Sequence, residues 1–234
     1  VDFVGSVNAV HLYSILPWDP GCKRVFSRRI GHVIPHMAML FRGFAVQITL
    51  ALSMEPLVLT VAGLWNSGPL HWQTHWEAKY PSWHRVIQRD WETPRCAEWV
   101  ETLTQAIAKC PRPPVLAAHS LGCALVAHWA ALSTPKAIAG AFLVAPSDVE
   151  APSYPAGTSG FIPMPLTTLP FPTLVVASTN DPYVSPERVR AFASAWGSEL
   201  ISIGDAGHIN GDAGYGPWPA GERLFLEFCN RVQG

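Results

Sequence analysis

The sequence predicts an α/β protein, a three-layer α/β/α sandwich built around a mostly parallel sheet. Six short apolar segments, each a candidate strand, alternate along the chain with segments of helical periodicity, the order that builds such a sandwich. The apolar segments are continuous and do not alternate with polar residues, which is typical of strands buried on both faces. The chain has 234 residues, enough for one domain of this kind with a full core.

The composition indicates an apolar protein suited to small, uncharged substrates. Charged residues make up 14% of the chain, against an average of about 25% in globular proteins. The formal net charge is −1 and the lysines and arginines are scattered, so nucleic-acid binding is not expected. The five cysteines are odd in number and include no C-x-x-C pair, which indicates thiols in a reducing compartment. The sequence sets no expectation for the oligomeric state.

Residues 1–53 differ in character from the rest of the chain. They carry five basic and two acidic residues, a net charge of +3, whereas the remainder carries 11 and 15, or −4. We favour an extension that is non-native or processed, with Met54 as the start of a domain in residues 54–234. Two alternatives stay open: a signal segment in residues 37–53, which would export the protein, or an additional element of the fold. Residues 37–53 are too short and interrupted to span a bilayer, so stable membrane insertion is not expected.

The first half of the domain contains three predicted strands. Residues 57–62 form the first, and Asn66 or Ser67 can then cap a helix that runs to about Lys79. Residues 83–88 form the second. Thr93-Pro94 starts the next helix, because proline is favoured in a first turn. The apolar face of that helix, which ends before a run of prolines, consists of Cys96, Val100, Leu103 and Ile107. The third strand, residues 115–119, leads directly into Ser120.

The second half continues the alternation of strands and helices. The strands are expected at residues 139–145, 173–178 and 200–203, and the helices at residues 121–132, from Ser185 to Gly197, and at 221–232. The proline-rich residues 146–172 show no periodicity, which predicts a long ordered loop in place of a cap helix. Such a loop is expected to border a functional site.

The residues from Ala118 to Gly122, with Ser120 at their centre, have the pattern of a nucleophile elbow. In this turn a serine hydroxyl stands out between a strand and a helix, and small residues two positions before and after it let the backbone bend. Alanine replaces the more usual glycine at the first of these positions. The alternative interpretation is an ordinary buried turn in which the serine only caps the helix.

Ser120, Asp181 and His208 each follow a predicted strand, so all three are expected at the carboxyl edge of the sheet. Their order along the chain, serine, acid, histidine, is that of the α/β-hydrolases. In this interpretation His208 is the general base and Asp181 orients it. Asp148 is the alternative acid. Asp205 or Asp212 could pair with His208 instead.

Backbone N–H groups and loop aromatics complete the predicted site. The N–H groups of Leu121 and Leu64 are expected to form an oxyanion hole, with Trp65 as the alternative to Leu64. Aromatic residues on loops are predicted to line a substrate pocket or to pack within their own loops. These aromatic residues are Trp65, Trp91, Tyr183 and Trp218.

Other candidate groups are assigned to packing. His71 and His75 have the spacing of metal ligands, but the accompanying glutamate is missing, so no metal is expected. His119 and His128 are interpreted as packing residues. Cys123 lies one helical turn after Ser120 and is expected to be buried and not nucleophilic.

Five segments in order along the chain resemble the small serine hydrolases related to retinoblastoma-binding protein 9. These segments are GLWNSGPLHWQ (63–73), QRDWETP (88–94), AHSLG (118–122), STNDPY (178–183) and GHIN (207–210). The likeness covers residues 54–234. It implies a compact α/β-hydrolase fold without a substantial cap domain, and Ser120, Asp181 and His208 as nucleophile, acid and base. It also implies a cytoplasmic enzyme without cofactors that hydrolyses small esters or amides. The motif L-x-C-x-E for retinoblastoma binding is absent, so that interaction is not expected.

The sequence therefore predicts a serine hydrolase that cleaves small carboxylic esters through an acyl-enzyme intermediate. An amidase or aminopeptidase-like activity is the first alternative, because the same three residues can expel an amine that His208 protonates. A binding protein that keeps the fold without the chemistry is the second. The substrate class in each case is a small-molecule ester or amide.

Overall fold

The structure is a computed structural model that describes residues 55–132 and 137–233. The predicted boundary at Met54 and the nature of residues 1–53 lie outside the described residues and stay predictions. Within the described residues, no helix is long and apolar enough to cross a membrane.

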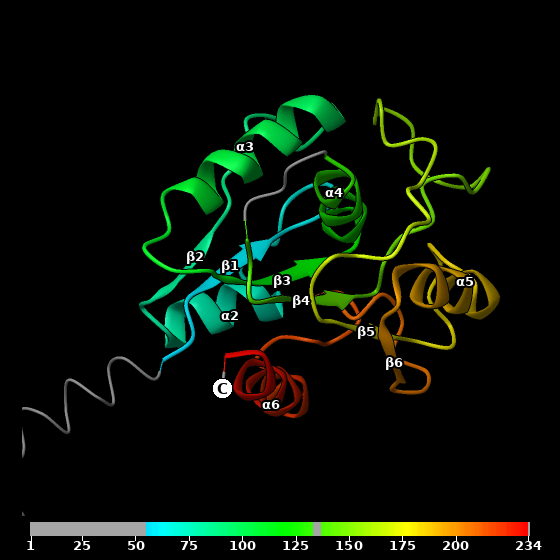
Figure 1. Ribbon diagram of the computed structural model, residues 1–234. Coiled ribbons are helices and arrows are strands. Elements are labelled where there is room, and N and C mark those ends of the chain that lie inside the picture. Colours follow the sequence, from blue (N-terminus) through cyan, green and yellow to red (C-terminus); the bar gives the residue numbers. More distant parts are fainter. Residues whose placement is uncertain (1–54, 133–136, 234) are drawn as a thin grey trace, which may run out of the picture. The chain divides into compact units, whose positions relative to one another are not determined.

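The described residues form one parallel sheet of six strands, as predicted (Figure 1). The spatial order is β2-β1-β3-β4-β5-β6, and every neighbouring pair is parallel. The strands are β1 (Val58–Val61), β2 (Trp83–Arg85), β3 (Val115–His119), β4 (Gly140–Val144), β5 (Thr173–Ala177) and β6 (Glu199–Ser202). In a parallel sheet all carboxyl ends lie on one edge, which is where residues following the strands gather.

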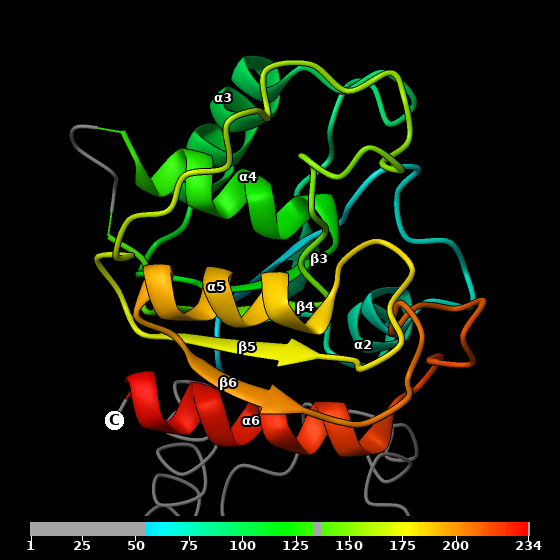
Figure 2. The ribbon, with the colours of Figure 1, turned by 90° about the vertical axis from the view of Figure 1, so that its right-hand side faces the viewer.

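Helices cover both faces of the sheet, which makes three layers. Figures 1 and 2 show α3, α4 and α5 over one face and α2 and α6 over the other. The helices are α2 (Trp72–Lys79), α3 (Cys96–Ala108), α4 (Leu121–Ala130), α5 (Pro186–Trp196) and α6 (Pro219–Gln233). The predicted fold class, a compact α/β/α sandwich, is therefore confirmed.

Alternate residues of each central strand enter two separate cores. In β3, Leu116 and Ala118 pack in the core beneath α3, α4 and α5, whereas Val115 and Ala117 pack in the core beneath α2 and α6. The other central strands divide in the same way, because successive side chains of a strand point to opposite faces. Burial on both faces explains why these strands are continuous apolar runs.

Several helix boundaries differ from the predictions, and α6 begins at Pro219, two residues before its predicted start. The first helix begins at Trp72, and its cap is His71 in place of Asn66 or Ser67. Asn66 has a left-handed backbone conformation, with φ 65°, and the segment before His71 is a loop. Ser67 donates its hydroxyl hydrogen to Gln73 Oε1 at 2.5 Å and does not cap the helix.

Two further differences concern α3 and α4. α3 begins at Cys96 and not at Thr93-Pro94, because the carboxylate of Asp90 accepts hydrogen bonds from the N–H groups of Glu92 and Thr93 and holds them in a turn. α4 ends at Ala130, two residues before its predicted end, and Leu132 beyond it is exposed.

The long loop and the helix after it follow the predictions. Residues 145–172 contain no helix, and one isolated bridge joins Ser159 to Arg95. Ser185 caps α5 by accepting a hydrogen bond from the N–H of Arg188, and Gly197 ends the helix in a left-handed conformation. Arg188 in turn binds Asp148 at 3.1 Å and also binds Glu150, which ties the loop to α5.

Candidate active site

The turn between β3 and α4 holds Ser120 in a sparsely populated backbone conformation, with φ 56° and ψ −125°. Conformations of this kind cost on the order of 1–3 kcal/mol and persist only where the surrounding structure maintains them. The Ser120 hydroxyl makes no hydrogen bond to the helix that it precedes. The alternative interpretation of Ser120 as a simple helix cap is therefore wrong.

Glycines allow the main chain to pass unusually close to this turn. A Cβ atom on Gly122 would lie 2.3 Å from the carbonyl oxygen of Val61, and one on Gly63 would lie 2.8 Å from Cβ of Ser120. Real Cβ atoms do not approach neighbours so closely, so both positions require glycine. The loop after β1 is therefore packed directly against Ser120.

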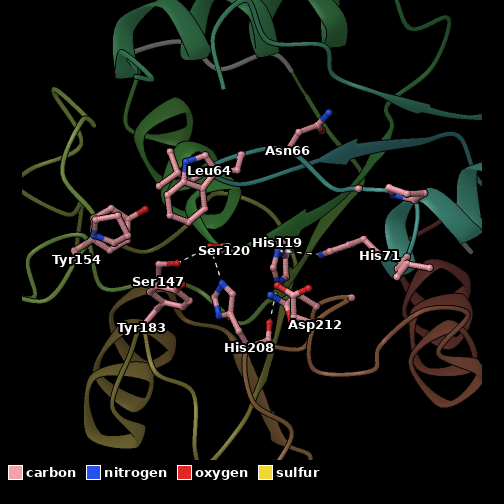
Figure 3. Close-up of a pocket in the computed structure, with 17 residues that line it drawn as sticks. Leu64, Asn66, His71, His119, Ser120, Ser147, Tyr154, Tyr183, His208 and Asp212 are labelled. Carbon is pink, nitrogen blue, oxygen red and sulfur yellow. Dashed lines mark hydrogen bonds between the residues drawn. The ribbon is translucent and has the colours of Figure 1, made fainter. Parts of the chain in front are cut away.

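Ser120, His208 and Asp181 form one chain of hydrogen bonds (Figure 3 shows the link between Ser120 and His208). Nδ1 of His208 lies 2.9 Å from both carboxylate oxygens of Asp181, and Nε2 lies 2.9 Å from Oγ of Ser120. The carboxylate accepts the Nδ1 hydrogen, which leaves Nε2 free to accept the hydrogen of Ser120. The N–H of Tyr183 donates to Asp181 at 2.9 Å and helps to hold the carboxylate in place.

The alternative acids occupy other positions. Asp148 pairs with Arg188, and Asp205 accepts a hydrogen bond from Thr179. Asp212 is exposed at the pocket. Among the described carboxylates, Asp181 is therefore the one that binds the His208 ring.

The main-chain carbonyls at His208 are also held. Nε2 of His119 lies 2.9 Å from the carbonyl oxygen of His208, and the indole N–H of Trp72 donates to the next carbonyl, that of Ile209, at 3.0 Å. Ile209 has a positive φ of 47° and is fully buried. β3 and α2 thus fix two consecutive carbonyl groups, those of His208 and of the residue that follows it.

The loop after β1 carries both candidates for the second oxyanion donor, Leu64 and Trp65. The N–H of Trp65 donates to the carbonyl of Trp91 at 2.9 Å, so this group is already used. A Cβ atom on Gly63, the residue before Leu64, would lie 3.0 Å from the backbone nitrogen of Leu121. The loop that carries Leu64 therefore lies beside the start of α4. This arrangement favours Leu64 over Trp65.

A partly buried arginine also holds this loop. Arg85 donates to the side chain of Asn66 at 3.0 Å and to the carbonyl of Ser67 at 2.7 Å. It also forms a two-point ion pair with Glu77 on α2. The loop that carries Leu64 is therefore anchored to β2 and α2.

A pocket of about 370 Å³ lies over Ser120 and His208. Leu64, Trp65 and Tyr183 line it, as expected for three of the predicted residues. Trp91 and Trp218 do not. The Trp91 ring packs edge-on against Trp99 at 5.4 Å, and Trp218 is buried and stacks on Trp76 at 5.9 Å.

Four side chains near the candidate nucleophile were not predicted to take part in the site. They are Ser147, Tyr154, His71 and His119, which all line the pocket. Oγ of Ser147 lies 2.7 Å from Oγ of Ser120. Ser147 follows β4 at the same edge of the sheet as the other residues, so its position after a strand was a usable signal. The histidine pair had no such signal, because nothing in the sequence links residues 71 and 119.

His71 and His119 form a directed chain of hydrogen bonds. Nδ1 of His71 accepts from the N–H of Gln73 at 3.2 Å, so its own hydrogen is on Nε2, which lies 3.3 Å from Nδ1 of His119. His119 then carries its hydrogen on Nε2 and donates to the carbonyl of His208. Burial lowers the pKa of His71 to about 3 and that of His119 well below its ordinary value, which keeps both rings neutral.

We expect the free energy of unfolding to fall as the pH is lowered from about 6.5 towards 3. The pKa of His71 is about 3 in the folded protein, against 6.5 for an unperturbed histidine. Between these pH values the unfolded chain therefore binds more protons than the folded protein does, so lowering the pH stabilises the unfolded state relative to the folded state. One fully shifted histidine contributes at most about 1.4 kcal/mol per pH unit. Urea unfolding between pH 7 and pH 4 measures the slope.

His71→Gln should make this pH dependence less steep, because glutamine does not titrate, while His119 still contributes. His84→Gln is the matched control, since His84 lies exposed on β2 and should leave the slope unchanged. An equally steep slope in His71→Gln and the wild type would contradict the assignment.

The remaining packing predictions agree with the structure. Nε2 of His128 lies 3.0 Å from the carbonyl of Phe161. The thiol of Cys123 is buried and donates to the carbonyl of Val144 at 3.4 Å. Burial raises the pKa of Cys123 well above its ordinary value, so the thiolate needed for nucleophilic attack is disfavoured.

Comparisons with known proteins identify the family. A family model described as serine hydrolase matches residues 58–227. Among solved structures, a protein described as a YdeN-like hydrolase from Pectobacterium atrosepticum is 35% identical, covers 79% of this chain and 96% of its own, and has a TM-score of 0.69.

More distant structures are similar in fold alone. The ydeN gene product of B. subtilis is 18% identical, with a TM-score of 0.58 over 74% of this chain and 98% of its own. A monoacylglycerol lipase of Paleococcus ferrophilus is 15% identical, with a TM-score of 0.55 over 74% of this chain and 95% of its own. A search of curated protein sequences gave no match. The chain therefore belongs to the serine hydrolase family and has the α/β-hydrolase fold.

Proposed function

We propose that the protein hydrolyses small carboxylic esters by a Ser-His-Asp mechanism with an acyl-enzyme intermediate. The observation that carries the proposal is the hydrogen-bonded chain from Asp181 through His208 to Ser120, at the base of an open pocket. Membership of the serine hydrolase family supports it.

The chemistry assigns one step to each group. Neutral His208 takes the hydrogen of Ser120 as Oγ attacks the ester carbonyl carbon, and Asp181 stabilises the imidazolium that forms. The N–H groups of Leu121 and Leu64 hold the negative oxygen of the tetrahedral intermediate. His208 then returns the proton to the leaving alcohol. A water molecule repeats the sequence on the acyl-enzyme.

The pocket supports a small substrate. Its walls combine apolar side chains, among them Leu64, Trp65 and Leu70, with the polar groups around Ser120. No salt bridge is formed by the described residues that line it, apart from the His208–Asp181 pair. Short, uncharged esters suit such a surface.

Three finer assignments belong to the same proposal. We assign the protein to the group of small hydrolases related to retinoblastoma-binding protein 9, on the five sequence segments that it shares with them. We place it in the cytoplasm, which the buried thiols of Cys96, Cys123 and Cys229 support. We also assign the activity to residues 54–234, since the family match lies within them.

Labelling with a fluorophosphonate tests the proposal. An activated serine attacks this reagent, so intact mass and peptide mapping should find one adduct, on Ser120, in the wild type and none in Ser120→Ala. Ser202→Ala is the matched control, because Ser202 is exposed at the end of β6 and its loss should leave labelling unchanged. Folded wild-type protein that takes up no label, or takes it up elsewhere, would overturn the proposal.

A further inference from the structure

The hydroxyl of Ser147 donates a hydrogen bond to the candidate nucleophile. Ser120 Oγ has two partners, Nε2 of His208 at 2.9 Å and Oγ of Ser147 at 2.7 Å. The single hydrogen of Ser120 is directed to Nε2, because Nδ1 of His208 already donates to Asp181. The hydrogen between the two serines therefore belongs to Ser147, which is almost fully buried.

A second buried hydroxyl lies on the same wall of the pocket. The Tyr154 hydroxyl oxygen is inaccessible to solvent and makes no hydrogen bond of normal geometry. Burial raises the pKa of Tyr154, and both Tyr154 and Ser147 line the pocket. In Figure 3 the Tyr154 hydroxyl is directed towards the interior of the pocket.

Formation of the acyl-enzyme would release the Ser147 hydrogen. Once Oγ of Ser120 is bonded to an acyl carbon it is an ester oxygen, a weaker acceptor than a hydroxyl. Ser147 and Tyr154 would then present two hydrogen-bond donors beside the acyl group, in a place where water does not satisfy them. A buried polar group without a partner is unfavourable, so the arrangement is complete only with an acceptor from the substrate.

The positions of the other groups decide which part of the substrate faces this wall. His208 must reach the leaving oxygen, and the N–H groups of Leu121 and Leu64 must reach the oxyanion. Ser147 contacts Ser120 from a different side than His208 does (Figure 3). The remaining substituent of the tetrahedral carbon is the acyl chain.

We propose that Ser147 and Tyr154 form a subsite for a hydrogen-bond acceptor, a hydroxyl or carbonyl oxygen, carried by the acyl chain close to the scissile bond. The inference rests on the proposed function and names its substrate class, short hydroxyacyl or oxoacyl esters. A site built to bind a substrate hydroxyl discriminates strongly against the analogue that lacks it, because its own polar groups are then left unpaired.

A pair of esters with equal shape measures this discrimination. The probes are p-nitrophenyl 3-hydroxybutyrate and p-nitrophenyl 3-methylbutyrate, which differ by a hydroxyl in place of a methyl group. After division by the rates of hydroxide-catalysed hydrolysis, kcat/KM of the wild type should favour the hydroxy ester by about tenfold or more. Tyr154→Phe and Ser147→Ala should each bring this ratio close to one, and Ser147→Thr, which keeps a hydroxyl, should restore it.

Tyr80→Phe is the matched control, because the Tyr80 hydroxyl binds Glu222 on α6, away from the pocket, and the ratio should not change. The readout is a ratio within each variant, so a general loss of activity in Ser147→Ala does not affect it. If Ser147→Ala does not fold, Tyr154→Phe decides.

Two results would overturn the subsite while leaving the proposed function intact. One is a ratio that is the same in the wild type and in Tyr154→Phe, with Ser120 still labelled by the fluorophosphonate. The other is a Tyr154-dependent preference for 2-hydroxyethyl butyrate over propyl butyrate, which would place the acceptor on the alcohol. Absence of both labelling and turnover in folded wild type would instead overturn the proposed function and the subsite together.

Discussion

Asp181→Asn is expected to slow the reaction of Ser120 by about 10⁴-fold while the protein stays folded. Both carboxylate oxygens of Asp181 lie 2.9 Å from Nδ1 of His208, so the carboxylate selects the tautomer with hydrogen on Nδ1. An amide can instead donate its own N–H to Nδ1. The hydrogen of the neutral ring would then move to Nε2, which could no longer accept from Ser120.

The second-order rate constant for fluorophosphonate labelling of Ser120 measures this loss without knowledge of the natural substrate. Asp148→Asn is the control, because Asp148 also follows a strand but pairs with Arg188. It should label at close to the wild-type rate. A decrease of less than tenfold in Asp181→Asn, with a wild-type thermal unfolding curve, would mean that another group orients His208.

Gly122→Ala should destabilise the protein by about 3 kcal/mol or more, or prevent folding. The added Cβ would lie 2.3 Å from the carbonyl oxygen of Val61 and 3.0 Å from that of Ala62. Both contacts are to the main chain of β1 or its end, which no side-chain rotation relieves. The turn at Ser120 would shift away from β1 together with Leu121, so labelling of Ser120 should fall as well.

Urea unfolding gives the change in stability, and Gly68→Ala is the matched control. A Cβ at Gly68 meets no atom within 4 Å, and Gly68 belongs to the loop that also contains Asn66. Its substitution should change stability little. Equal unfolding midpoints for Gly122→Ala and the wild type would show that β1 does not lie this close to the turn at Ser120.

The strands and most helices could be predicted because each depends on local properties of the chain. The central strands are buried on both faces, so their residues form uninterrupted apolar runs that need no knowledge of neighbours. α5 has its own start and stop signals in Ser185, Pro186 and Gly197. The start of α2 was missed because Asn66 and Ser67 have the residue types of helix caps, yet both are held in the preceding loop by Arg85.

Some residues of the candidate site could likewise be predicted from local properties of the chain, whereas others depend on tertiary packing. Ser120, Asp181 and His208 could be proposed because each follows a strand, and parallel strands bring their carboxyl ends to one edge. Which aromatic residues face the pocket depends on how loops fold back: Tyr183 reaches His208, with ring centroids 4.5 Å apart, whereas Trp218 turns into the core. The partnership of His71 with His119 depends on tertiary packing, so composition and spacing could not indicate it.

The two hydrogen bonds on consecutive carbonyls bear on how the proposed reaction would proceed. His119 on β3 holds the carbonyl of His208, and Trp72 on α2 holds that of Ile209. The imidazole is thus preorganised, since its orientation is established when the protein folds and not anew in each turnover. A catalytic cycle on this framework would need no swing of the base into position, and the loops facing solvent would be left to control substrate entry and product release.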